Sequence, residues 1–166
     1  MSGLSTRSFC TLDEGVDTTY GITGGVIIKT VLDTNILFAG LYSARGASFQ
    51  VLKALSQEKI RPVLSVPLLF EYEDVLKRDS RKLGITHEDI DSFLDNVCNL
   101  CTFHEIHYLW RPFLRDPKDD LVLELALAAQ ADTITTFNTK DFKGVEQLGV
   151  RVQSPKQLLE EIQWEL

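Results

Sequence analysis

Residues 26–35, VIIKTVLDTN, limit the possible folds of this 166-residue chain more than any other segment. They form a β-branched apolar run that ends abruptly in polar residues, as a buried strand of a parallel sheet does at its carboxyl end. Further short β-prone segments lie at residues 62–66, 101–106, 133–137 and 150–152. The chain is therefore expected to build a sheet of several short strands.

Amphipathic helical patterns separate these strands, at residues 47–58, 67–78, 86–100 and 121–130. Helix start signals agree with the pattern, because proline falls at an expected first turn three times, at Pro67, Pro117 and Pro155. Thr86 with Asp89 resembles a capping box, and Ser154 is a ready N-cap. Alternating strands and helices predict an α/β fold: a mainly parallel central sheet with helices on both faces, which makes three α/β/α layers.

Composition narrows the class of protein. With 44% apolar and 25% charged residues, the chain has the make-up of one globular domain. Its net charge of −7 gives no support to a partner held by overall positive charge, although a local basic patch remains compatible with it. No apolar run approaches the roughly 20 residues of a membrane span, so no membrane association is expected. Three cysteines are too few for a disulfide framework, which favours the cytoplasm.

Composition and hydrophobic periodicity divide the chain into three expected parts. Residues 1–25 mix Ser, Thr and Gly without a sustained period, and their acids exclude a signal peptide, so they are interpreted as an N-terminal tail, native or not. Residues 26–162 are expected to form the folded domain, and residues 163–166 its C-terminal end.

Acidic and amide side chains cluster where strands end or helices begin. The members are Asp33 and Asn35 after the first strand, Asp116, Asp119 and Asp120 before the helix at 121–130, and Asn138 and Asp141 after the strand at 133–137. In a parallel α/β sheet all three places can face one crevice at the carboxyl ends of the strands. The simpler interpretation is that Asp116 and Asp119 only cap a helix and that Asp33 is only a turn residue.

A glutamate on the helix at 67–78 is a fourth candidate. Glu71 and Glu73 lie on the two borders of its apolar stripe, and periodicity alone does not choose between them. Carboxylates brought close together repel one another unless a proton or cation neutralises them. Oxygen ligands of this kind suit Mg²⁺ or Mn²⁺, and such ions support phosphodiester hydrolysis.

Taken together, four segments resemble a PIN domain, and most closely the bacterial branch that supplies toxin components of toxin–antitoxin pairs. They are VLDTNIL at 31–37, VPLLFEYEDVLKR at 66–78, RDPKDDLVLELALAAQADTITTFNTKDF at 115–142 and SPKQLLEEI at 154–162. The resemblance implies a three-layer nuclease fold and a metal-dependent endoribonuclease that hydrolyses single-stranded RNA. It also implies a homodimer and a small antitoxin protein as partner.

The resemblance assigns roles to individual residues. Asp33, Glu71 and Asp120 correspond to the catalytic, metal-binding acids, and Asp119 or Asp116 is expected to assist. Asn35 and Thr136 are expected to position the site. At the fourth acidic place the chain departs from the family pattern, because Asn138 stands where many members have an aspartate; Asn138 and Asp141 are the remaining candidate metal ligands.

The substrate side is predicted from charge alone. A nuclease needs cations near its crevice to hold phosphates, and the candidates are Arg45, Arg115, Lys118 and Lys140. A denser basic run, Lys77, Arg78, Arg81 and Lys82, is more typical of a solvated helix end.

Other signals are interpreted as structural. Cys98 and Cys101 form a CxxC at the end of a helical pattern and are expected to be ordinary half-buried thiols, and His104 and His107 lack the partners of a zinc site. Trp110 and Trp164 are expected to pack rather than to stack on bases. Two competing functions remain: a catalytically weak PIN module that acts as a binding or scaffold domain, and a phosphatase-like α/β domain, which the absence of a DxD disfavours.

Overall fold

A computed structural model describes residues 27–107 and 113–165, so the expected N-terminal tail and Trp110 lie outside the described residues. The sheet has five strands in the order β3-β2-β1-β4-β5, and all four pairings are parallel. The strands are β1 (Ile28–Leu32), β2 (Ile60–Leu64), β3 (Thr102–Phe103), β4 (Thr133–Thr135) and β5 (Arg151–Gln153). The predicted parallel α/β architecture is confirmed.

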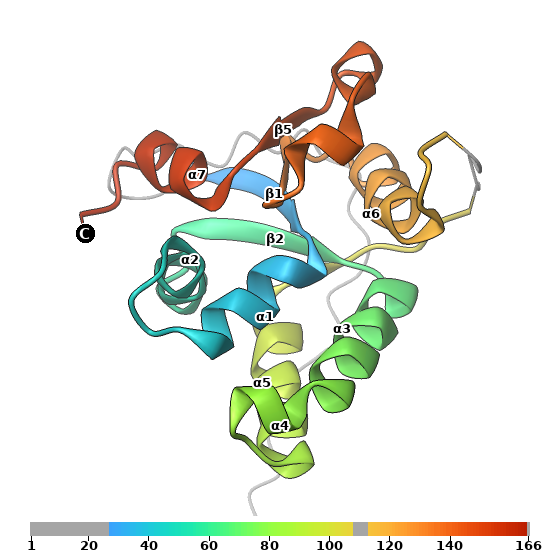
Figure 1. Cartoon of the computed structure of the whole chain (residues 1–166). Helices are drawn as coiled ribbons and strands as arrows, with labels where there is room; N and C mark the ends of the chain where they lie inside the picture. The colour runs from blue at the N-terminus through green and yellow to red at the C-terminus, as the bar shows by residue number, and fades with distance from the viewer. Residues whose placement is uncertain (1–26, 108–112, 166) are drawn as a thin grey trace, which may run out of the picture.

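Helices flank the sheet on both faces (Figure 1), which gives the expected three layers. They are α1 (Thr34–Tyr42), α2 (Ala47–Ser56), α3 (Val66–Arg78), α4 (Ser80–Leu83), α5 (His87–Leu100), α6 (Pro117–Ala128) and α7 (Pro155–Glu161), with the 3₁₀ turns η1 (Thr139–Phe142) and η2 (Val145–Leu148). Helix α2 packs on both α1 and α7, and α6 packs on β1, β2 and β4. No helix within the described ranges is long and apolar enough to cross a membrane.

Local sequence signals explain most helix starts. Thr86 and Ser154 each form a complete capping box, and Ser65 caps α3 by accepting a hydrogen bond from the backbone N–H of Leu68. Proline occupies the first turn of α3, α6 and α7, where its missing N–H removes no helical bond.

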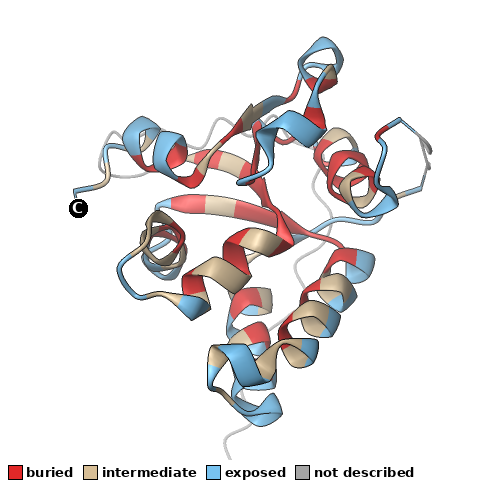
Figure 2. Ribbon diagram, in the orientation of Figure 1, coloured by how far each residue is buried: buried red, intermediate tan, exposed pale blue. Residues whose placement is uncertain are grey.

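The core fills the space between the sheet and its helices, and buried residues follow the strands and the inward faces of the helices (Figure 2). Val31, Ile134 and Leu64 are fully buried at the centre of the sheet. Gly40 allows α1 to approach α2, because a Cβ there would lie 2.5 Å from the Leu52 Cδ1 atom.

Several elements differ from the sequence expectation: α4, η1 and η2 were not predicted, and β2 begins and ends two residues before the predicted strand at 62–66. No helix was predicted at α1 either, because its apolar residues run all round the helix and give little periodicity. Strand β3 has two residues rather than the expected six at 101–106, since it is an edge strand that pairs only with β2 and both of its residues are exposed.

Candidate functional site: an acidic cleft at the carboxyl edge of the sheet

Asp33 follows β1 directly and occupies the N-cap position of α1, where it is 8% exposed. Its Oδ2 atom accepts two hydrogen bonds, one of 2.7 Å from Asn35 Nδ2 and one of 2.6 Å from the Thr136 hydroxyl. The two residues expected to position the site therefore both hold the Asp33 carboxylate.

Thr136 ties this carboxylate to the adjacent strand. Its hydroxyl oxygen accepts from Asn35 Nδ2 at 3.1 Å and from the backbone N–H of Asn138 at 3.0 Å. The backbone N–H of Phe137 in turn donates to Asn35 Oδ1 at 3.3 Å. The network exists because β1 and β4 are neighbours, so the residues that follow both strands meet at one edge of the sheet.

A cleft of about 380 Å³ opens beside Asp33. Seven of the candidate site residues line it: Asp33, Asn35, Glu71, Asp116, Lys118, Asp119 and Asn138. Thr34, Phe38, Val75, Asp79 and Lys82 complete the lining. The structure thus brings side chains from all four predicted acidic places, the fourth being Glu71 on α3, to one surface.

Asp120, the expected third acid, is placed elsewhere. Its carboxylate is buried, and Oδ1 accepts from the backbone N–H groups of Phe113 at 3.2 Å and Leu114 at 2.8 Å. Asp119 lines the cleft in its place. Asp119 and Asp120 are neighbours on α6 and point about 100° apart, and here Asp119 lies on the cleft while Asp120 points to backbone N–H groups. The assignment of the third acid to Asp120 stays a prediction, and Asp119 is the alternative that the geometry offers.

The charges in the cleft disturb one another. Burial raises the pKa of Asp119 to about 6, and the charges of Asp33, Asp116, Asp141 and Asp120 add to the effect. The pKa of Asp33 is also raised, first by burial and further by the charge of Glu71, although the hydrogen bond from Thr136 opposes the rise. The cleft therefore holds more negative charge than its surroundings can stabilise.

Glu71 is the helix α3 glutamate that faces the cleft, whereas Glu73 pairs with Lys77 on α3 at 2.6 Å. The Glu71 Oε1 atom lies 2.8 Å from Lys118 Nζ, and its side chain is 18% exposed. This contact raises the pKa of Lys118. Lys118, predicted as a substrate-binding cation, thus neutralises one of the cleft's own acids, which sequence spacing gave no means to foresee.

Tyr72 fastens the helix that carries Glu71. It is buried in the core, its hydroxyl donates a hydrogen bond to the Leu32 carbonyl, and burial raises its pKa well above the usual value. Leu32 immediately precedes Asp33, so this one bond ties α3 to the start of the site. Tyr72 was not among the residues expected at the site; the signal that could have found it is that a buried tyrosine hydroxyl needs a hydrogen-bond partner.

The donor set fits a hard divalent cation in its chemistry. Asp33, Glu71 and Asp119 offer carboxylate oxygens and Asn138 offers an amide oxygen, which are ligands typical of Mg²⁺ and Mn²⁺. Excess negative charge in the cleft favours such an ion. Across the described residues, however, no three His, Cys, Asp or Glu side chains are gathered closely enough to hold a metal as they stand. Binding of an ion would therefore require these side chains to move closer together.

The remaining predicted residues lie outside the cleft. Arg45 lines a separate hollow beside α7, with Gln50 and Trp164, and the Trp164 indole N–H donates to Gln50 Oε1 at 3.2 Å. Arg115 and Lys140 are exposed and are not among the residues that line the cleft. Asp141 is exposed on η1 and reaches the site only through the effect of its charge on Asp119.

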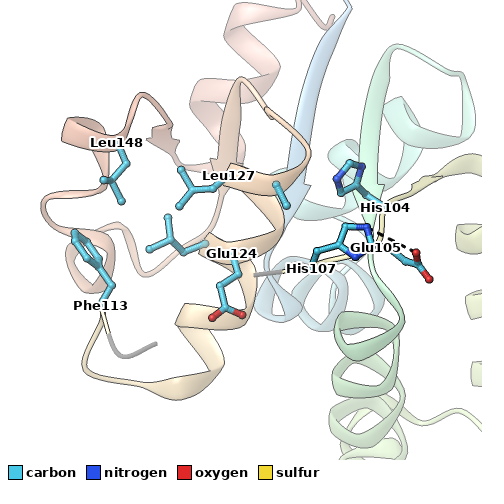
Figure 3. Close-up of a pocket in the computed structure, with 9 residues that line it drawn as sticks. His104, Glu105, His107, Phe113, Glu124, Leu127 and Leu148 are labelled. Atoms are coloured by element: carbon cyan, nitrogen blue, oxygen red, sulfur yellow. Dashed lines mark ion pairs between the residues drawn. The ribbon is translucent and has the colours of Figure 1, made fainter. Parts of the chain in front are cut away.

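A larger hollow of about 510 Å³ lies away from these acids, against α6 (Figure 3). Apolar side chains such as Phe113, Leu127 and Leu148 form one part of its lining, and His104, Glu105 and His107 form another. His107 and Glu105 are 74% and 88% exposed, so water solvates both side chains. It contains none of the candidate acids.

Cys98 and Cys101 are free, half-buried thiols at the end of α5. Burial raises the pKa of Cys101 to about 12 and raises that of Cys98 as well. Both therefore stay protonated at neutral pH, which agrees with the interpretation that they are structural.

The fold and the cleft define a class of α/β/α domains that present acidic side chains at the carboxyl edge of a parallel sheet. The sequence model described as PIN domain matches residues 29–140, which is more than half of the chain. The chain belongs to the PIN domain family.

Two solved structures share the fold. VapBC2 from Rickettsia felis, solved with a DNA fragment from its promoter, aligns with a TM-score of 0.55 and 18% identity, over 76% of this chain and 98% of that one. VapBC-1 from nontypeable Haemophilus influenzae aligns with a TM-score of 0.53 and 16% identity, over 78% of this chain and 99% of that one. A search of curated proteins found no match.

Proposed function

We propose that this protein is a divalent-metal-dependent endoribonuclease that cleaves single-stranded RNA, and that it is the toxin of a toxin–antitoxin pair. The observation that carries the proposal is the meeting of Asp33, Glu71 and Asp119 on one cleft at the carboxyl edge of the sheet. Membership of the PIN domain family and the likeness to VapBC assemblies support it. The proposed partners are RNA, a small antitoxin protein and a second copy of the chain, and the proposed location is the cytoplasm.

Asp33, Glu71 and Asp119 would hold Mg²⁺ or Mn²⁺, with Asn138 as a neutral oxygen donor. Such an ion, when bound, activates water and stabilises negative charge on the phosphate. Asn35 and Thr136 act through Asp33: their two hydrogen bonds to Oδ2 fix the orientation of the carboxylate and favour its charged form against the effect of burial.

Lys118 has two roles in this proposal, one in the metal-free protein and one when metal and RNA are bound. In the absence of metal its ammonium pairs with Glu71 and relieves repulsion in the cleft. The side chain is 54% exposed, so it is free to rotate outward when an ion takes over that task. Its charge then remains at the rim of the cleft, where it can contact an RNA phosphate.

The direct test is incubation of the purified protein with an unstructured RNA in Mn²⁺, beside the variants Asp33→Asn, Asp119→Asn and Asp120→Asn. Wild type and Asp120→Asn are expected to cleave, because an asparagine at 120 retains an acceptor oxygen for the Phe113 and Leu114 amides. Asp33→Asn and Asp119→Asn are expected to be inactive. Equal cleavage by all four proteins would remove the assignment, and loss in Asp120→Asn alone would return the third role to Asp120.

The second candidate is a binding or scaffold module with weak or no catalysis. Two observations favour it: the neutral Asn138 at the fourth acidic place and the lack of a closed metal cluster within the described part of the chain. Calorimetric titration with Mn²⁺ separates the two functions, because the nuclease requires binding and an absence of binding at millimolar Mn²⁺ supports the scaffold.

A further inference from the structure

Two aromatic rings lie in line with the acidic cleft on helix α1. Phe38 lines the cleft itself, and its ring is stacked on that of Tyr42, with centroids 6.0 Å apart and an interplanar angle of 11°. Tyr42 is 65% exposed, which is unusual for a side chain with so much apolar area.

The two rings lie on the same side of α1 as Asn35. Asn35, Phe38 and Tyr42 fall within about 60° of one another on a helical wheel, so they form a single line along α1. The opposite side of the helix, with Ile36, Leu37 and Gly40, is buried. At 1.5 Å per residue, Tyr42 lies about 13 Å along the axis from Asp33. The line therefore leads from the acids outward over an open surface.

Charge alone offers little to hold a polyanion here. The two lysines that line the cleft are each paired with an acid, Lys118 with Glu71 at 2.8 Å and Lys82 with Asp79 at 2.7 Å. Asp33, Asp116 and Asp119 add further negative charge to the same lining. In the metal-free protein, a single-stranded nucleic acid bound at this surface must gain affinity from contacts other than phosphate pairing, and base stacking on aromatic rings is an established source.

We propose that Phe38 and Tyr42 form a base-stacking platform for single-stranded RNA, on which a base of a strand that also reaches the acidic cleft packs against the exposed face of Tyr42. The proposal rests on the proposed nuclease function and specifies how that site selects unpaired strands. A base within a duplex is already stacked and offers no free face to Tyr42, so a platform favours single strands.

The test measures binding apart from cleavage. Fluorescence anisotropy of a labelled, unstructured RNA in EDTA gives the dissociation constant of wild type, Tyr42→Leu and Tyr42→Trp. Loss of one stacked base is expected to weaken binding by Tyr42→Leu at least about fivefold, whereas Tyr42→Trp should bind as tightly as wild type or more tightly. The fluorescence added by the new indole should be quenched by RNA. Strands with abasic sites should bind wild type and Tyr42→Leu equally.

Phe70→Leu is the matched control. Phe70 is an exposed aromatic, at 62%, on α3 and does not line the cleft. The variant Phe70→Leu should bind RNA with the same dissociation constant as wild type. Equal binding by Tyr42→Leu and wild type, or an equal loss in Phe70→Leu, would overturn the platform.

Cleavage of the same RNA in Mn²⁺ by wild type and Asp33→Asn separates this inference from the proposed function. Metal-dependent cleavage that Asp33→Asn abolishes, combined with unchanged binding by Tyr42→Leu, removes the platform and leaves the nuclease standing. A wild-type protein that neither binds nor cleaves RNA removes both.

Discussion

Replacing a proposed catalytic acid should make the metal-free protein more stable. Asp119 has its pKa raised from 3.8 to about 6 in the folded protein, first by burial and then by four neighbouring carboxylates. The folded state therefore holds the proton more tightly than the unfolded state does. Stability falls as the pH rises from 3.8 through about 6, and the whole cost is present above pH 6.

The size of the effect follows from the two pKa values. At about 1.36 kcal/mol per pH unit, the rise to about 6 corresponds to about 3 kcal/mol for a group shielded from water. Asp119 is only half-buried, and solvent screening reduces the expected cost to about 1–2 kcal/mol. Asp119→Asn removes the charge with almost no change in shape. At pH 7.5 it should raise the free energy of unfolding by about that amount and the Tm by about 3–8 °C.

The assay is thermal and urea unfolding in EDTA, followed by far-ultraviolet circular dichroism from pH 4 to pH 8. The advantage of Asp119→Asn should nearly vanish at pH 4, where wild-type Asp119 is protonated in the folded state. Asp95→Asn, a change at an exposed aspartate on α5, serves as control and should not alter stability in this pattern. Mn²⁺ at about 100 times its dissociation constant should stabilise wild type by about 2.7 kcal/mol and reverse the order. An advantage of Asp119→Asn that is absent at pH 7.5, or unchanged at pH 4, would refute the electrostatic reasoning.

Three further predictions test the parts around the acids. Thr136→Val should lower the free energy of unfolding by about 2–3 kcal/mol in urea titrations, because the buried Asp33 carboxylate loses a 2.6 Å donor, and a loss under about 0.5 kcal/mol would contradict this. Lys118→Met should tighten Mn²⁺ binding up to about fivefold in calorimetry by freeing Glu71; weaker binding would show that the lysine does not compete with the ion. Gly40→Ala should cost about 1–2 kcal/mol in thermal unfolding, because its Cβ would lie 2.5 Å from a side-chain carbon and 3.1 Å from a backbone oxygen of α2; unchanged stability would mean that the two helices separate freely.

The general architecture was readable from local patterns. The β1 run, the proline positions and the capping box at Thr86 predicted strands and helix starts that the structure confirms. These signals are local because strand burial, caps and first-turn prolines depend on a few consecutive residues. Helix α1 was not predicted, because a prediction from local periodicity needs a distinct apolar face. Its apolar residues lie all round the helix, so its sequence shows no such face.

The sequence predicted which segments contribute to the site, but not which side chains of those segments face the cleft. Parallel topology predicted that the residues after the strands can face one crevice, and the pairing of β1 with β4 brings those that follow these two strands together. The choice between Asp119 and Asp120 was beyond the sequence, because it depends on which way α6 is rotated against the sheet. One residue of rotation is about 100°, enough to turn a cleft acid into a backbone acceptor.

The amino-acid sequence by itself determined the layers of this protein, the order of its elements and the supply of acidic groups at one edge of the sheet, because periodicity and capping act over short stretches of chain. Only the tertiary structure decided that Asp119 faces the cleft, that Lys118 pairs with Glu71 across 47 positions and that Tyr72 ties α3 to β1. These contacts join residues far apart in the chain. Whether such residues touch depends on how each helix packs on the twisted sheet, to within a few ångström. A local sequence pattern carries no information on that packing.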